Sequence, residues 1–544
     1  MKDVREHYYI PTLKEQFAVG KVDRREFLRT STLLGLSAAA AYAFVGKVTG
    51  ESFVAPAKAA LPKGGTLRLA YRVQDLKDPH TYSWGQSNIT RQVCEYVTKT
   101  GQDNITRPYL AESWAASDDL KTWTITLRKG IKWHNGRDFD VDDVIWNIKH
   151  ALDPDTGSSM LGLMQGYMMN DDATALWDAN AIERVDSHTL RLNCKSPQLA
   201  VPEHFFHYPF HILDPEEGGK FVVGSNGTGA FNLVHAEVGK KAVIEARDDY
   251  WGEGPYIDAL EYHDLGDDPS AALGALASKQ VHGLDEAVIT QLDALRQLEH
   301  LQIYQIATAQ TGVARMRPEK PFDDPRVRKA MRLATDSAKI LELAYRGLGK
   351  PAEHHHVCPI HPEYAKLPVM KRDIAAAKAL LAEAGYADGI DTKIDCKPDT
   401  VWELIAVQGM VEQWKEAGIR CEINVMPSAQ FWEIWDKTPF GFTEWTHRPL
   451  GVMVLGLAYR SGVPWNESAY SNPEFDRLLT KAEGILDVDA RRAVIRELEI
   501  IMQEDGPIVQ PLWRAVFTAH DKRVKGFSMH PTSYMFANEL ALEA

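Results

Sequence analysis

The chain has 544 residues, of which 44% are apolar and 25% are charged, and its formal net charge is −14. This length exceeds what one hydrophobic core can serve, so it predicts two or three domains. The acidic charge argues against nucleic acid as a partner, because a phosphate backbone attracts basic surfaces. After residue 60 no stretch approaches the roughly 18 to 20 consecutive apolar residues that span a bilayer, so we expect a body that is not membrane-embedded.

The N-terminus has the features of an export signal. Arg24 and Arg25 precede an almost wholly apolar run over 33–45, which is too short to span a membrane. An A-x-A pattern follows at 57–59, where a signal peptidase could cut. This order predicts a twin-arginine signal peptide over 1–59 and hence a periplasmic protein, with an amphipathic N-terminal helix as the alternative reading.

The predicted elements then alternate in type. A strand is expected over 61–75, where Leu67, Leu69 and Tyr71 alternate with polar residues, and Asp142 is expected to open a helix. Residues 101–225 are otherwise rich in short strands and turns. Helical periodicity dominates the segments 271–298, 326–345, 374–384, 404–417, 475–486 and 490–504.

In the second half of the chain, predicted helices and strands alternate as in an α/β domain. Gly418 ends one predicted helix and leads directly into a predicted strand over 419–425. This arrangement is typical of parallel strand pairing. Cys396 and Cys421 lie in two such strands, which could be neighbours in a parallel sheet. Since the chain has five cysteines, at least one thiol stays unpaired, and for Cys396 and Cys421 both a disulfide and two reduced thiols remain open.

Several enzyme signatures are missing from the sequence. It contains no phosphate-binding P-loop, no H-E-x-x-H helix and no G-x-S-x-G nucleophile elbow. We therefore expect no catalytic residue, no cofactor and no enzyme activity. The one metal-like cluster is the run of three histidines at 354–356, with Cys358 and His361 nearby. Of these, His354, His356 and His361 are weak candidates for zinc or nickel ligands. A solvated loop is the preferred reading of this segment, because adjacent residues of an extended loop point in different directions.

Four segments carry a recognisable set of motifs. They contain LAESW, WTITLR, WHNG and DDV (110–144), NGTGAF and RDDYW (226–251), PFDDPRVRKAM (321–331), and NESAYSNPEFD (466–476). Their order and spacing resemble the extracellular solute-binding proteins of the peptide/nickel family, family 5, which serve ABC importers. Most of these residues have structural roles: we expect Trp114, Trp123 and Trp133 to be core aromatics and Asp323 to cap a helix.

The resemblance implies an α/β, two-lobed periplasmic-binding-protein fold with mixed sheets, an extra inserted domain and hinge crossover strands near 306–315 and 514–518. Lobe I would comprise 60–100, 226–308 and 518–544, the inserted domain 101–225, and lobe II 309–517. The lobes would close on a ligand. The implied partners are a small molecule, a peptide or small organic acid, and the transmembrane subunits of an ABC permease, with the protein as a monomer.

The resemblance also places a ligand site. The expected ligand-binding residues are Tyr82, Trp84, Arg315, Trp445, Arg448, Trp465 and Asn466. Peptide binders of this family usually carry an acid after the Trp that matches Trp445, and here that acid is missing. Arg448 stands nearby, which favours a ligand with a carboxylate, such as a peptide or an opine-like conjugate, although Arg448 could instead pair with Glu444. The alternatives are a receptor for a nickel chelate or haem, and a hydrolase that uses the same cleft.

Overall fold

The computed structural model describes residues 6–51, 61–398 and 400–544. The chain divides into two compact units. Unit 1 comprises Met1–Asp285, Ala294–Tyr304 and Thr518–Ala544, and unit 2 comprises Glu286–Asp293 and Gln305–Phe517. Two long strands, β12 (Leu301–Met316) and β18 (Leu512–Asp521), run from one unit into the other. They contain the segments in which crossover strands were expected.

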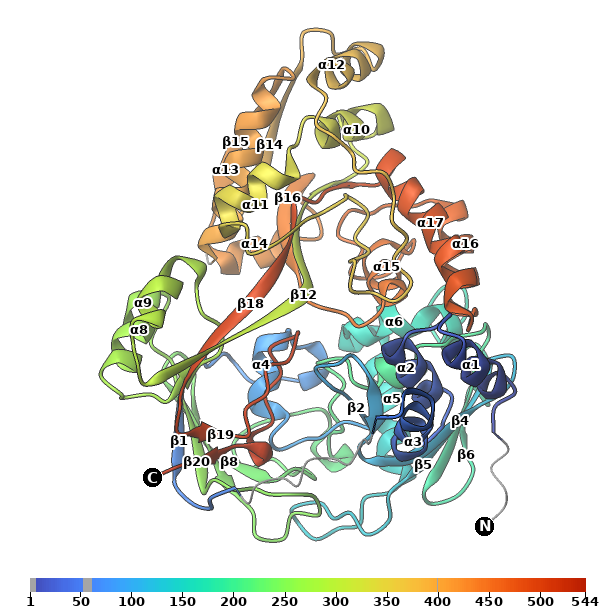
Figure 1. The fold of residues 1–544 in the computed structure, drawn as a ribbon, viewed down its shortest axis with the longest axis vertical. Coiled ribbons are helices and arrows are strands. Elements are labelled where there is room, and N and C mark those ends of the chain that lie inside the picture. The colour runs from blue at the N-terminus through green and yellow to red at the C-terminus, as the bar shows by residue number, and fades with distance from the viewer. Residues whose placement is uncertain (1–5, 52–60, 399) are drawn as a thin grey trace. The chain divides into compact units, whose positions relative to one another are not determined.

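Unit 1 is built on a mixed sheet (Figure 1). Its strands, in spatial order, are β8 (Phe231–Glu237), β9 (Lys241–Ala246), β10 (Ala259–His263), β1 (Thr66–Ala70), β11 (Gly283–Leu284) and the C-terminal end of β18. Strand β1 pairs in parallel with both β10 and β11. Leu67 and Leu69 are buried in the core beneath this sheet, as the alternating pattern predicted.

The segment 101–225 forms a second, antiparallel sheet with helices. The strand order is β4 (Ala111–Ala116), β5 (Thr122–Leu127), β7 (Thr189–Asn193) and β6 (Ile182–Arg184), with α5 (Val141–Leu152), α6 (Ser159–Met168) and α7 (Val201–His204) as its helices. Trp114, Trp123 and Trp133 are buried, which confirms them as core aromatics. The cap of α5 is Asp140, whose carboxylate accepts from the backbone N–H of Asp142, so the helix begins at Val141, one residue earlier than expected.

The remaining elements of unit 1 are short. They are the strand pairs β2 (Thr98–Thr100) with β3 (Thr106–Pro108) and β19 (Val524–Lys525) with β20 (Ala541–Leu542), and the helices α4 (Trp84–Thr90) and α8 (Pro269–Ala277). Helix α9 (Leu292–Arg296) lies at the unit boundary.

Among the residues described before β1 there are three helices, α1 (Tyr9–Ala18), α2 (Arg24–Leu33) and α3 (Ala38–Thr49). Arg24 and Arg25 are exposed at the start of α2, whereas Phe27 and Leu28 are buried. The expected cleavage site at 57–59 lies outside the described residues. In the part of the chain that the structure describes, no helix is long and apolar enough to cross a membrane.

The sheet strands of unit 2 are, in spatial order, β15 (Ile419–Val425), β14 (Ile390–Cys396), β16 (Phe440–Trp445) and β12. Strand β17 (Ile508–Val509) pairs with β12, and β13 (Gly349–Pro351) pairs with β18. The helices are α10 (Pro325–Leu333), α11 (Ser337–Tyr345), α12 (Ile374–Glu383), α13 (Val401–Lys415), α14 (Ser428–Ile434), α15 (Gly451–Tyr459), α16 (Pro473–Glu483) and α17 (Val488–Glu504). Helix α13 lies against β15, and α11 lies against α13 (Figure 1).

Two helix predictions need correction. The cap of α10 is Asp324, not Asp323, because the Asp324 carboxylate accepts from the backbone N–H of Arg326 at 2.8 Å. The periodic segment 271–298 is not one helix: α8 ends at Ala277 and the chain enters the sheet as β11. A Cβ at Gly283 would lie 2.1 Å from Nδ1 of His520, so only glycine fits this close strand pairing.

The two cysteine strands are neighbours, but the cysteines are not bonded. Strands β14 and β15 pair in parallel, as predicted, and all five cysteines of the chain are free. The register places Cys421 opposite Thr392 and Cys396 opposite Val425. Four residues of strand separate the two sulfurs by about 13 Å along the sheet, too far for a disulfide.

Candidate functional site

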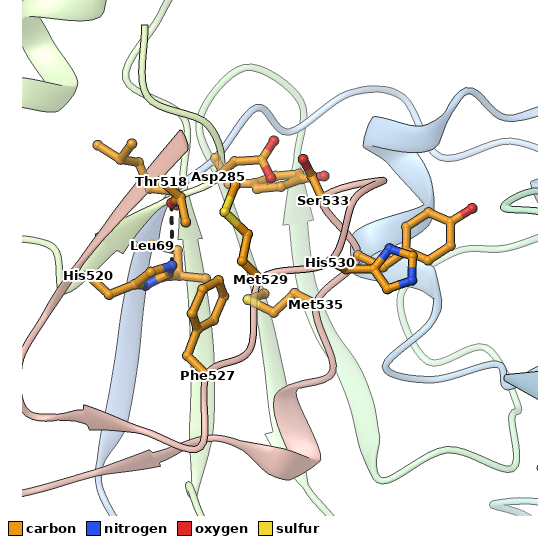
Figure 2. Close-up of a pocket in the computed structure, with 12 residues that line it drawn as sticks. Leu69, Asp285, Thr518, His520, Phe527, Met529, His530, Ser533 and Met535 are labelled. Carbon is orange, nitrogen blue, oxygen red and sulfur yellow. Dashed lines mark hydrogen bonds between the residues drawn. The ribbon is translucent and has the colours of Figure 1, made fainter. Parts of the chain in front are cut away.

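Unit 1 contains a narrow pocket at one edge of its sheet (Figure 2). Tyr71 directly follows β1 and Asp285 directly follows β11, so the pocket lies at the carboxyl ends of two parallel strands. Open α/β sheets characteristically bind their ligands at this edge. The other lining residues are Leu69, Leu284, Thr518, His520, Phe527, Met529, His530, Ser533, Tyr534 and Met535.

The surface of the pocket is mostly apolar, although seven of its twelve lining residues carry a polar side-chain atom. Figure 2 shows Met529 and Met535 between the His520 and Phe527 rings on one side and His530 on the other. Thioether side chains are flexible and can repack around a guest. Apolar walls with polar groups among them are the usual composition of a small-molecule site.

Charge in this pocket comes from one residue. Burial lowers the pKa of His520 and of His530 to about 3, so both imidazoles are neutral at physiological pH. The pocket has no lysine or arginine among its lining residues, and Asp285 is its one acidic side chain. The pocket therefore suits a ligand group that is cationic or that donates hydrogen bonds.

The two predicted ligand residues of unit 1 lie outside this pocket. Tyr82 is buried, and its hydroxyl donates to the Lys77 carbonyl at 3.1 Å. Trp84 is the first residue of α4 and is partly exposed. The structure thus gives Tyr82 a packing role, and leaves Trp84 an accessible ring.

Unit 2 contains a row of edge-to-face aromatic rings. Trp445 lies 6.1 Å from Trp465, which lies 6.2 Å from Trp435, which lies 6.0 Å from Trp432. Trp445 is buried, Trp465 and Trp435 are partly exposed, and Trp432 is exposed. The row offers apolar contact area that becomes more accessible from Trp445 towards Trp432.

Glu467 fixes the buried end of this row. Its carboxylate accepts from Nε1 of Trp445 at 2.8 Å and from Nε of Arg315 at 3.0 Å. Arg315 is fully buried, and its other nitrogens donate to the carbonyls of Thr438, at 2.8 Å, and Trp435. Arg315 therefore positions the loops around the tryptophans, and each of its three side-chain nitrogens donates within the fold.

Arg448 and Asn466 are also engaged by their own loops. The Arg448 guanidinium is buried and donates to the carbonyls of His447, at 3.0 Å, and Thr446, at 3.2 Å. Asn466 donates to the carbonyls of Arg460 and Tyr470 and accepts from the backbone N–H of Tyr470. Glu444, the alternative partner considered for Arg448, instead binds Arg514.

The histidine segment is not a solvated loop, which corrects the preferred reading. His354, His356 and His361 are all buried. The backbone N–H of Gln510 donates to Nδ1 of His354 at 3.0 Å, and Nε2 of His361 donates to the Arg448 carbonyl at 3.0 Å. These bonds hold the segment inside unit 2, where burial lowers the pKa of His354 to about 3.

The ring nitrogens of this segment do not converge. Among the described residues, the group of three whose potential ligand atoms come together is a different one, comprising Asp78, His80 and His150.

Sequence reasoning missed several of these side chains. The pocket residues Asp285, His520 and Met529 come from segments far apart in the chain, and no local pattern marks them. Trp432 and Trp435 did carry a signal, because the run FWEIW on α14 places two indoles one helical turn apart.

Comparisons with known proteins agree on the family and the fold. A sequence model of the bacterial extracellular solute-binding proteins, family 5 (middle), matches residues 106–451. The glutathione-binding protein GsiB of Salmonella paratyphi A is 25% identical over 454 residues, which cover 78% of this chain and 84% of that protein.

Solved structures resemble this chain over most of its length. The PBP AgaA of A. tumefaciens R10, in complex with agropinic acid, matches with a TM-score of 0.79 and 20% identity over 88% of this chain and 99% of AgaA. The periplasmic binding protein DppA of Helicobacter pylori, in complex with the peptide STSA, matches with a TM-score of 0.77 and 20% identity over 89% and 99%. These likenesses confirm the predicted periplasmic-binding-protein fold.

Proposed function

Because the chain belongs to the bacterial extracellular solute-binding proteins of family 5, we propose that it captures a peptide or opine-like amino-acid conjugate for an ABC importer. The observation that carries the choice of ligand is the pocket of unit 1, in which Asp285 is the one acidic side chain and no lysine or arginine is present. A ligand with a free amine complements this carboxylate. Arg448 stays our candidate for the ligand's carboxylate, and Trp84, Trp445 and Trp465 our candidates for aromatic contacts.

We also propose how the protein is exported and where it works. It is exported by the twin-arginine pathway through Arg24 and Arg25, works in the periplasm as a monomer, and passes its ligand to the permease without catalysis. Support comes from the exposure of both arginines on α2. Export is tested by replacing both with lysine and locating the processed protein by cell fractionation.

The metal-chelate and haem alternative receives less support. The histidines that motivated it are buried, and they hydrogen-bond to the backbone and side chains of unit 2. Native mass spectrometry of protein purified from its host would distinguish the two, since a retained amino-acid conjugate and a retained chelate differ in mass.

Asp285→Asn is expected to weaken binding of an amine-bearing ligand roughly tenfold or more, because a charge-assisted hydrogen bond is lost. Calorimetric titration with a ligand, for example a peptide, and with its N-acetylated form measures this loss. The acetylated form should bind both proteins equally. Asp267→Asn is the control, since Asp267 is an exposed acid of the same unit. Unchanged affinity in Asp285→Asn would rule out the pocket as the amine site.

Arg448→Ala is expected to weaken binding of the carboxylate form roughly tenfold or more, and to spare the corresponding amide. Arg477→Ala, which removes an exposed arginine of the same unit, is the matched control. If Arg448→Ala loses affinity for acid and amide alike, the residue only supports its loop and the carboxylate assignment is wrong.

A further inference from the structure

A second cluster of chemically active side chains lies in unit 1, apart from the pocket residues. Asp78 caps the short 3-10 turn Pro79–Thr81, which contains His80, and His150 lies in the last turn of α5. One potential ligand atom from each residue lies within 4.8 Å of the other two. The cluster thus joins the loop after β1 to the helix of the 101–225 segment.

The Asp78–His150 pair is held in place from several sides. Asp78 Oδ1 accepts from the backbone N–H of His80 at 2.9 Å, which leaves Oδ2 to meet Nε2 of His150 at 2.6 Å. The His150 ring stacks on Trp146, with centroids 4.7 Å apart, and its Nδ1 lies 3.4 Å from the Thr156 hydroxyl. The His150 ring is therefore oriented by contacts outside the cluster, and the Asp78 carboxylate by the backbone N–H of His80.

The His80 ring has the hydrogen-bonding pattern of a histidine that binds a metal. Its Nε2 lies 2.8 Å from the carbonyl of His211, and because a carbonyl only accepts, Nε2 carries the proton. A neutral, fully buried ring then has its lone pair on Nδ1. Among the described residues this Nδ1 has no hydrogen-bond partner. A histidine that donates one N–H to a backbone carbonyl and offers its other nitrogen is the usual arrangement of a metal ligand.

A glycine and a surface hollow beside the cluster leave it uncrowded and accessible to solvent. A Cβ on Gly219 would lie 2.7 Å from Nε2 of His150 and 3.0 Å from Oδ2 of Asp78. Any side chain at this position would therefore crowd the two ligand atoms. Gly219 and Asp78 both line a surface hollow, which gives solvent and ions a path to the cluster.

We propose that Asp78, His80 and His150 form a binding site for a divalent transition metal of the zinc type, with water from the hollow completing the coordination. Two imidazole nitrogens and one carboxylate oxygen favour zinc over calcium or magnesium, which prefer oxygen ligands alone. Ligand atoms around tetrahedral zinc lie about 3.4 Å apart. Because the three potential ligand atoms now lie within 4.8 Å of one another, small side-chain rotations bring them to the spacing that zinc requires. This site shares no residue with the proposed ligand pocket.

The test is a zinc titration of the metal-stripped mature protein against a chromophoric chelator, with Co²⁺ absorption as a second readout. We expect one tight zinc per chain and the visible bands of tetrahedral Co²⁺. Asp78→Asn and His150→Gln should each lower the zinc affinity at least about tenfold and abolish those bands. His80→Phe, which keeps a ring of similar size, should do the same if the third ligand is real.

The control is His263→Gln. His263 pairs with Glu261 at 2.8 Å with similar exposure, but has no third ligand nearby among the described residues. This variant should bind zinc as the wild type does. An equal loss in His263→Gln, or wild-type protein that binds zinc no more tightly than Asp78→Asn, would overturn the proposal. Because Asp78→Asn and His150→Gln change partly exposed residues, they test the site even if His80→Phe fails to fold.

Discussion

Replacing Arg514 with Met is expected to lower the free energy of unfolding by about 4 kcal/mol, because it leaves two inward-facing carboxylates without their cation. Arg514 is 2% exposed in its side chain and binds Glu286 and Glu444, and also Gln310 at 2.5 Å. Met keeps an unbranched apolar stem without the charge, and its thioether can pack on Trp402, above which the guanidinium now lies. Urea denaturation followed by circular dichroism measures the loss.

The control removes the negative charges as well. Arg514→Met combined with Glu286→Gln and Glu444→Gln should recover much of the lost stability, because no uncompensated charge then stays buried. If the triple variant is as unstable as Arg514→Met alone, the loss comes from packing and not from charge.

The loss in Arg514→Met should also depend on pH. Burial raises the pKa of Glu286, and Arg514 opposes this rise. Without Arg514 the pKa in the folded chain rises further above its unfolded value. A carboxyl group of this kind binds its proton more tightly when folded, so folding is favoured as the pH falls and disfavoured as it rises. The variant should therefore be closer to wild type at pH 5 than at pH 8.

Elements with a local signal could be predicted from the sequence. The alternation of Leu67 and Leu69 predicted β1, and the step from helix through Gly418 to strand predicted the parallel pairing of β14 with β15. Both features depend on residues within one element or at its end. The helical periodicity of 271–298 led to a wrong prediction of one continuous helix. In the structure Gly283 instead lies in the sheet, close to the His520 ring.

The candidate sites needed tertiary contacts that no local pattern contains. Asp285 and Met529 meet in one pocket although they lie far apart along the chain, and neither stands in a distinctive sequence pattern. Cys396 and Cys421 lie on neighbouring strands, but only the register shows that they cannot bond. The consecutive histidines looked like a polar loop, yet their bonds to Gln510 and the Arg448 carbonyl bury them. Register and long-range hydrogen bonds decide these cases.

Glu467→Gln is the second substitution with a large expected effect, because one carboxylate serves two buried donors. Gln can accept from Nε1 of Trp445 with its oxygen, but its amide group then faces Nε of Arg315, so a donor meets a donor. We expect a loss of about 3 kcal/mol in the free energy of unfolding, since the Arg315 charge stays buried without its anion. Urea denaturation measures this loss, and calorimetry on the same protein measures ligand binding.

The ligand measurement separates a structural role from a positioning role. If Glu467 orients Trp445 for the ligand, Glu467→Gln should weaken binding at least about tenfold, measured where both proteins are fully folded. Glu483→Gln is the matched control, because Glu483 pairs with Arg460 at 2.7 Å in the same unit. It breaks an arginine–carboxylate pair that holds no indole, so it should lose stability and keep its affinity. Ligand affinity within twofold of wild type in Glu467→Gln would show that the Trp445 ring takes no part in binding, and would leave Trp465, Trp435 and Trp432 as the aromatic contacts of unit 2.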